Sequence, residues 1–222
     1  MSTKMKRVII ICEGQTEHEF CKDVLTPFLF NKHIIVQAPL IKKSGGGIVP
    51  WEVLKKQIGI HLKQDPDAII TTLIDYYGIP EKYNYPEWHE AHNVPDKALR
   101  LNILENAMHQ SFSEQLQQRF IPYIQLHEFE SLLFTDVKIF NDNFTKDEFV
   151  DFTAFKKIFE TFPNPEDIND GETSAPFKRL LYHIKGYNKI VHGAGLAEET
   201  GLIRIREKCP RFNSWIKKIE ES

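Results

Sequence analysis

The segment from residue 7 to residue 12, Arg-Val-Ile-Ile-Ile-Cys, constrains the fold more than any other part of the sequence. It is apolar and rich in β-branched residues on both faces, which is typical of a central parallel strand that helices cover on both sides. Glu13 follows this segment directly. The sequence therefore predicts a buried first strand with a carboxylate at its end.

The residues after Glu13 predict a turn and a helix. Gly14 permits a tight turn, and Thr16 with Glu19 three residues later has the pattern of a capping box. We expect this helix to run to about Phe30. The chain thus begins with a strand, a turn and a helix.

Apolar runs and helical patterns alternate over the next hundred or so residues. Further strands are expected over 33–41, 68–74 and 120–126, and helices over 50–63 and 97–118. The irregular stretch between Tyr76 and Asp96 is long for a connection, so we interpret it as a lid or binding loop over the strand ends. We predict an α/β fold: a mostly parallel, Rossmann-like sheet flanked by helices in residues 1–140. Residues 141–222 are predicted to form a C-terminal helical extension, a cap packed on this core.

Composition limits the class of protein. Of the 222 residues, 41% are hydrophobic, which is sufficient for a buried core. There is no apolar run of about eighteen residues and no secretory leader pattern, so we expect a cytoplasmic protein without a membrane span. The three cysteines lack CxxC spacing, and the net charge of −3 gives the whole chain no attraction to nucleic acid. These features argue against a disulfide scaffold and against a stand-alone DNA-binding protein.

Carboxylates stand at the ends of three predicted strands. Glu13 follows the first strand, Asp75 the third and Glu128 the fourth, while Glu17 lies in the first helical turn. The carboxyl ends of parallel strands meet at one edge of a sheet, so these acids are expected to lie together. Clustered carboxylates repel one another unless a cation neutralises them, and Mg²⁺ or Mn²⁺ prefers such oxygen ligands. The sequence therefore predicts a divalent-metal site.

Such a site would suit phosphodiester chemistry. One or two ions would position the phosphodiester, polarise a phosphoryl oxygen and activate water for in-line attack. Glu13 would serve as a ligand or as the general base. Taken singly, Glu17 is favourable at any helix N-terminus and Asp75 is common turn chemistry, so it is the coincidence of three strand ends that favours the site.

A second pattern lies between residues 177 and 197. This stretch has no acid, and its basic residues are interleaved with tyrosines and histidines; they are Lys178, Arg179, Lys185 and Lys189. Such a stretch can follow a phosphate backbone and stack on bases. Solvated helix faces have a similar composition, so nucleic-acid binding and an ordinary helix surface both stay open.

Blocks of the sequence resemble the uncharacterised domain-of-unknown-function family DUF4276. They are residues 11–17 (Ile-Cys-Glu-Gly-Gln-Thr-Glu), 73–78 (Leu-Ile-Asp-Tyr-Tyr-Gly), 127–134 (His-Glu-Phe-Glu-Ser-Leu-Leu-Phe), and a C-terminal block of 195–201 and 209–215. The order of the blocks is more specific than any one of them, and the resemblance spans nearly the whole chain.

That family is similar to Toprim domains, the fold of topoisomerases, bacterial primases and overcoming-lysogenization-defect nucleases, which bind Mg²⁺ with a strand-end Glu and an Asp-x-Asp pair. The resemblance implies that Glu13 is the Toprim glutamate and Asp75 the first aspartate of the pair. Tyr77 stands in place of the second aspartate and has only a neutral hydroxyl. Glu128 or Glu130 would then have to provide the missing ligand.

We therefore expect a metal-dependent nuclease of Toprim type. Glu13, Asp75 and Lys189 would be catalytic, with Lys189 assigned from the family resemblance. The ligands of Mg²⁺ or Mn²⁺ would be Glu13, Glu17, Asp75, Glu128 and Glu130. The resemblance also implies a partner ATPase of the ABC or AAA type and a role in phage defence or DNA repair. DNA is favoured over RNA as the substrate, and a homodimer stays open. The alternatives are a non-catalytic Toprim-like module that binds an ATPase partner or a nucleotide, and an enzyme that transfers nucleotidyl or phosphoryl groups.

Overall fold

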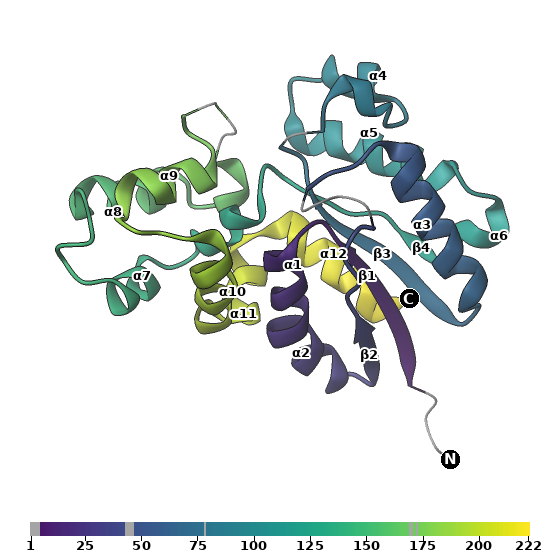
Figure 1. Ribbon diagram of the computed structural model, residues 1–222, viewed down its shortest axis with the longest axis horizontal. Coiled ribbons are helices and arrows are strands. Elements are labelled where there is room, and N and C mark those ends of the chain that lie inside the picture. Colours follow the sequence, from purple (N-terminus) through teal and green to yellow (C-terminus); the bar gives the residue numbers. More distant parts are fainter. Residues whose placement is uncertain (1–4, 43–46, 78, 169–170, 172) are drawn as a thin grey trace.

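Figure 1 shows the computed structural model, which describes residues 5–42, 47–77, 79–168, 171 and 173–222. Its sheet has five strands, and the pairings between them are parallel. The strands are β1 (Lys6–Cys12), β2 (Ile34–Gln37), β3 (Ala68–Asp75), β4 (Phe120–Ile121) and β5 (Ile124–Gln125). Their order is β2-β1-β3-β4, and β5 also pairs with β3. The predicted α/β class with a mostly parallel sheet is confirmed, and β1 and β3 are its central strands.

The central strands are apolar on both faces because both faces are covered. Val8, Ile10 and Cys12 of β1 are buried in one hydrophobic cluster, and Ile9 and Ile11 are buried in another on the opposite face. Every residue of β3 is buried. Successive side chains of a strand point to opposite faces, so an unbroken apolar run requires two apolar layers.

Helices form those two layers and extend beyond the sheet (Figure 1). They are α1 (Gln15–Phe20), α2 (Thr26–Phe30), α3 (Trp51–Gln64), α4 (Trp88–His92), α5 (Lys97–Gln110), α6 (Glu114–Gln117), α7 (Val137–Asn143), α8 (Phe152–Thr161), α9 (Pro176–His183), α10 (Lys189–Thr200), α11 (Leu202–Lys208) and α12 (Pro210–Glu221). A π-helical turn, Cys21–Leu25, joins α1 to α2, and 3-10 helices span Glu81–Tyr83, Phe129–Leu133 and Pro165–Asp167. In the described part of the chain, no helix has both the length and the apolar character that a membrane crossing requires.

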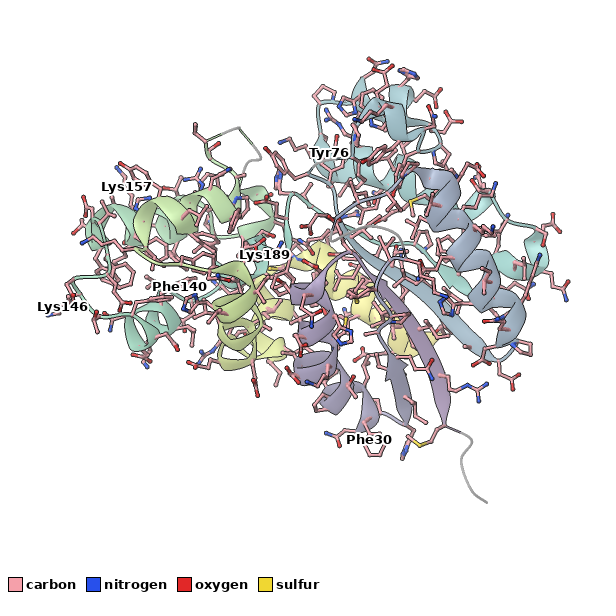
Figure 2. The ribbon with its side chains drawn as sticks, viewed as in Figure 1. Phe30, Tyr76, Phe140, Lys146, Lys157 and Lys189 are labelled. Carbon is pink, nitrogen blue, oxygen red and sulfur yellow. The ribbon has the colours of Figure 1, made fainter. Side chains whose placement is uncertain are left out.

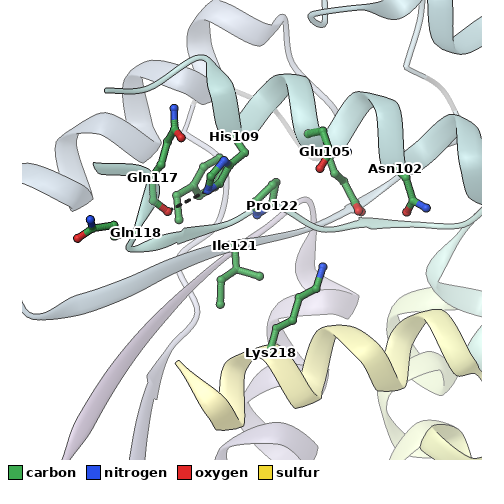
Figure 3. A pocket seen from close by; sticks show the side chains of 10 residues that line it. Asn102, Glu105, His109, Gln117, Gln118, Ile121, Pro122 and Lys218 are labelled. Atoms are coloured by element: carbon green, nitrogen blue, oxygen red, sulfur yellow. Dashed lines mark hydrogen bonds between the residues drawn. The ribbon is translucent and has the colours of Figure 1, made fainter. Parts of the chain in front are cut away.

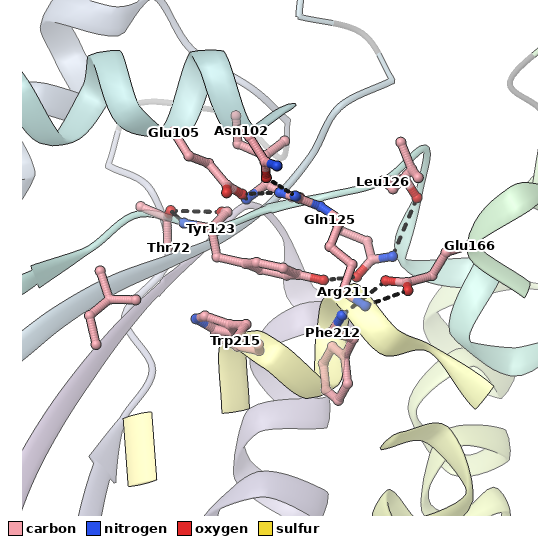
Figure 4. A network of polar contacts seen from close by, with 12 residues as sticks. Thr72, Asn102, Glu105, Tyr123, Gln125, Leu126, Glu166, Arg211, Phe212 and Trp215 are labelled. Carbon is pink, nitrogen blue, oxygen red and sulfur yellow. Dashed lines mark hydrogen bonds and ion pairs between the residues drawn. The ribbon is translucent and has the colours of Figure 1, made fainter. Parts of the chain in front are cut away.

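The last helix joins the C-terminal residues to the sheet. In α12, Trp215 Nε1 donates to Thr71 Oγ1 at 2.8 Å, and its ring stacks on Tyr123 with centroids 4.5 Å apart. At the start of α12, Glu166 accepts hydrogen bonds from two backbone N–H groups, and the Arg211 guanidinium forms an ion pair with Glu105 of α5 (Figure 4). The division into a core of residues 1–140 and a cap of residues 141–222 stays a prediction.

Prolines shorten two of the predicted strands. β2 ends before Pro39, and the strand expected over 120–126 is divided into β4 and β5 at Pro122. Proline has no N–H for the ladder, so a sheet accommodates it at edges and breaks. Beyond the break the backbone N–H of Tyr123 donates to Thr72 Oγ1 at 3.0 Å, so a side chain of β3 replaces a ladder bond.

The starts and ends of two predicted helices also differ. The first helix begins after Gly14, and Thr16 lies inside it, so the predicted capping box at Thr16 is wrong. Glu17 makes the capping contact with the Gly14 N–H. The helix predicted over 97–118 is two helices, because α5 ends at Gln110, with Ser111 as its C-cap, and α6 begins after its N-cap Ser113. Serine favours helix ends, since its hydroxyl competes with the helical backbone bonds.

The stretch interpreted as a lid contains ordered structure. It forms a 3-10 turn and α4, which lies against α5 (Figure 1). The rings of Trp88 and His92 stack with centroids 3.8 Å apart, and Tyr85 is buried against Trp51. This segment therefore packs on the second hydrophobic layer.

Candidate functional site

The carboxyl ends of β1 and β3 lie side by side. An acid directly follows β1, and an acid is the last residue of β3. Cys12 of β1 pairs with Leu73 of β3, so Glu13 and Asp75 stand at neighbouring strand ends. The backbone N–H of Asp75 donates to Glu13 Oε2 at 2.9 Å. The structure thus brings together two acids that lie far apart in the sequence.

Two further acids reach the same place. Glu17 lies in the first turn of α1, where its Oε2 accepts from the Gly14 N–H at 2.9 Å. Glu130 lies in the 3-10 helix after β5 and is fully buried. Asp75 Oδ1 accepts from the Phe129 N–H at 2.9 Å, which fixes that 3-10 helix against the end of β3.

Lys189 is the first residue of α10 and is labelled in Figure 2. Its ammonium group lies among these acids. Its Nζ lies 3.2 Å from Glu130 Oε2, 3.6 Å from Glu17 Oε1 and 3.8 Å from Asp75 Oδ2. Glu13 completes the group through its hydrogen bond with Asp75. We refer to Glu13, Glu17, Asp75 and Glu130 as the acid cluster.

A close helix contact positions Lys189. Gly193 lies one turn along α10, and a Cβ atom there would stand 2.8 Å from Thr16 Cγ2 of α1. Only glycine allows the two helices to approach so closely. Asn188 also fixes the start of α10, because its side chain accepts from the N–H groups of Ile190 and Val191. The backbone at Lys189 is therefore fixed by the Asn188 cap before it and by the Gly193 contact after it.

The acid cluster has more carboxyl groups than its one ammonium group can neutralise. Burial raises the pKa of Glu13 to about 7 and that of Glu130 to about 7, and it raises the pKa of Asp75 well above its ordinary value. Burial acts to lower the pKa of Lys189, but the surrounding carboxylates outweigh it and keep this pKa above its usual range. One ammonium thus faces four carboxyl groups, and the site favours either bound protons or a further cation.

Several buried oxygens of this region make no hydrogen bond to the described residues. They are Glu17 Oε1, Glu130 Oε1 and the hydroxyl of Tyr187. Burial raises the pKa of Tyr187, and Glu130 adds to the rise, so this hydroxyl is neutral and lies near the cluster. The sequence placed Tyr187 among the aromatic residues of the basic stretch, and its position beside the acid cluster was not predicted. Buried acceptors without partners are costly, and a bound cation or water would satisfy them.

Glu128, a predicted ligand, and Tyr77, which stands in place of the second aspartate, make contacts of their own. Glu128 Oε2 accepts from the backbone N–H of Phe177 at 2.9 Å, so its side chain turns toward α9. Tyr77 is 38% exposed, and its backbone N–H donates to His127 O. Of the two acids that the sequence offered as a replacement for the second aspartate, it is Glu130 that contacts Lys189.

The basic stretch does not converge on the cluster as a whole. Lys178 is exposed on α9, and Lys185 Nζ donates to the carbonyl of Asp147 at 2.7 Å. Arg179 donates to a backbone carbonyl, and its guanidinium lies 5.3 Å from the centroid of the Phe162 ring. Only Lys189 of the four is seen to contact the acid cluster, and nucleic-acid binding by the other three stays a prediction.

Carboxylate oxygens are the ligands that Mg²⁺ and Mn²⁺ prefer, so the chemistry of the acid cluster fits a hard divalent ion. Within the ranges given above, however, no three His, Cys, Asp or Glu side chains are arranged to hold a metal ion. The Lys189 ammonium lies between the carboxylates in this conformation. An ion would therefore need Lys189 to move aside.

A cavity of about 570 Å³ lies elsewhere, between α5 and α12 along the edge strand β4 (Figure 3). Its polar lining is mostly amides, with His109, Lys218 and Glu105. No acid-cluster residue lines it, and Glu105 is paired with Arg211. This cavity lacks the concentration of unbalanced charge that marks the strand ends.

One comparison with known protein families matches nearly the whole chain. The family described as "Domain of unknown function (DUF4276)" matches residues 12–220. Searches of curated proteins and of solved structures gave no match. The family match includes β1's last residue, the whole acid cluster and α10, and covers nearly all of the chain. The chain therefore belongs to the DUF4276 family.

Proposed function

We propose that this protein is a divalent-metal-dependent nuclease of Toprim type that hydrolyses phosphodiester bonds, with DNA as the favoured substrate, in the cytoplasm. One observation supports this above all others. Four acids meet at the carboxyl ends of the two central parallel strands. They come from the end of β3, from α1, from the position after β1 and from the 3-10 helix after β5. Active sites of open α/β sheets lie at this edge.

Glu13, Glu17, Asp75 and Glu130 are the residues that would hold Mg²⁺ or Mn²⁺. When bound, the ion would supply Lewis-acid stabilisation of the charge that develops on the phosphoryl oxygens. The fit rests on an all-oxygen ligand set with a charge excess and on the buried Glu130 Oε1, which has no hydrogen-bond partner in the described part of the chain.

The protein's own groups have distinct tasks in this proposal. Glu13 is the most exposed acid of the cluster, and its Oε2 is fixed by the Asp75 N–H, so it is placed to accept a proton from the attacking water. The side chain of Lys189 is 30% exposed, and its ammonium group would balance negative charge on the phosphate. The Phe129 N–H donates to Asp75 Oδ1, and this hydrogen bond fixes the Asp75 carboxylate within the cluster.

A non-catalytic role is the second candidate, and a specific observation favours it. Lys189 already forms three ion pairs within the cluster, and Tyr77 replaces the second acid of the Toprim pair. A Toprim-like module that binds an ATPase partner or a nucleotide would need no metal at this place. The partner ATPase of the ABC or AAA type and a role in phage defence or DNA repair are proposed from the family resemblance alone.

A cleavage assay separates these two functions. Supercoiled DNA, single-stranded DNA and RNA are incubated with the protein in Mn²⁺ or in EDTA, and the wild type is compared with Asp75→Asn and with a matched control, Glu198→Gln, which changes an exposed acid of α10. We expect Mn²⁺-dependent cleavage by the wild type and the control, and a loss of at least a hundredfold in Asp75→Asn with an unchanged circular dichroism spectrum. Equal cleavage by Asp75→Asn, or no cleavage of any substrate with or without a partner ATPase, would contradict the nuclease.

A further inference from the structure

Lys189 lies where a divalent ion would have to bind. Its ammonium is within 4 Å of one oxygen each of Glu17, Asp75 and Glu130, which come from three separate elements. A divalent ion needs these same oxygens, and it would repel an ammonium at that distance. The two cations therefore cannot share the centre of the cluster.

The side chain of Lys189 can move out of the acid cluster, whereas its backbone is fixed by the start of α10. Asn188 caps the first turn of α10, and the contact of Gly193 with Thr16 holds the next turn against α1. The lysine side chain is 30% exposed, so it has a route to solvent, and its stem has four rotatable bonds. The motion required is a change of side-chain rotamer, with no displacement of the helix.

We propose that Lys189 is an internal latch: its ammonium holds the acid cluster together when no divalent ion is present, and it swings outward when an ion binds. The displaced ammonium then lies at the mouth of the site, where the phosphate of a substrate arrives. The latch rests on the proposed metal site. Ion binding would thus expose a positive charge to the phosphate of the substrate. The affinity for the substrate would therefore rise only after the ion is bound.

Amine labelling of the full-length protein tests the latch directly. The protein is treated with an acetylating reagent in Mg²⁺ or in KCl of equal ionic strength, and acetylation of each lysine is followed by peptide mass spectrometry. Lys146 and Lys157 are exposed and lie far from Lys189 in Figure 2, so they serve as internal references. We expect Mg²⁺ to accelerate acetylation of Lys189 at least fivefold and to leave both references unchanged.

Calorimetric titration with Mg²⁺ tests the metal site separately from the latch. If Mg²⁺ binds to the wild type and not to Asp75→Asn, but Lys189 stays protected, the latch is wrong and the metal site stands. If Mg²⁺ does not bind at all, both are wrong. As a second arm, Lys189→Met should bind Mg²⁺ at least tenfold more tightly than the wild type, whereas Lys146→Met should not; equal affinity in Lys189→Met would overturn the latch.

Discussion

Replacing Glu130 by glutamine should stabilise the protein at alkaline pH when divalent ions are absent. Glu130 is fully buried, and burial raises its pKa from an ordinary 4.5 to about 7. The folded state therefore keeps a proton that the unfolded state loses, and the free energy of unfolding falls as the pH rises from about 4.5 to 7. Since each pKa unit corresponds to about 1.4 kcal/mol, the charged carboxylate costs up to about 3 kcal/mol above pH 7.

Glutamine has the same shape and no charge, so Glu130→Gln removes this cost, although a weaker contact with Lys189 offsets part of the gain. We expect the variant to exceed the wild type by about 1–3 kcal/mol at pH 8 and to equal it within about 0.5 kcal/mol at pH 4.5. Urea unfolding in EDTA at both pH values measures this difference, with Glu198→Gln as the exposed control. A variant that is less stable than the wild type at pH 8 would refute the assignment of excess negative charge to the cluster.

Three further substitutions test the packing that positions the site, each by urea unfolding. Gly193→Ala should cost about 1–3 kcal/mol, because the added methyl group would meet Thr16 Cγ2, and Thr16→Ser should restore most of the loss. Trp215→Phe should cost about 1–3 kcal/mol through loss of its hydrogen bond to Thr71, and an unchanged stability would contradict that contact. Glu166→Ala should cost about 1–2 kcal/mol, because two N–H groups at the start of α12 lose their acceptor; no loss would show that water replaces it.

The central strands and their acids were predictable because the signal is local. An apolar run followed at once by Glu13, and a second run ending at Asp75, define two buried parallel strands whose ends share one edge. The breaks at Pro39 and Pro122 had a visible signal in the prolines themselves. The true start of α1 at Gly14 was missed because Thr16 and Glu19 also fit a capping pattern.

The rest of the site depends on tertiary contacts that no local pattern encodes. Lys189 meets Glu130 across 59 residues of sequence, and it does so because Gly193 allows α10 to approach α1. The choice between Glu128 and Glu130 depends on where the 3-10 helix begins, since Glu128 precedes its first residue and turns toward α9. The sequence placed Lys189 in the basic stretch, and the family resemblance assigned it as catalytic, but its ion pairs with the cluster were not foreseen.

Anomalous diffraction from a crystal soaked in Mn²⁺ would locate a bound ion at the acid cluster. We expect an anomalous peak in contact with carboxylate oxygens of Asp75, Glu17 and at least one of Glu13 and Glu130, with the Lys189 ammonium displaced toward solvent. If no peak lies at the strand ends under saturating Mn²⁺, and Lys189 keeps its three ion pairs, the cluster is a structural network and the proposed metal-dependent chemistry is wrong.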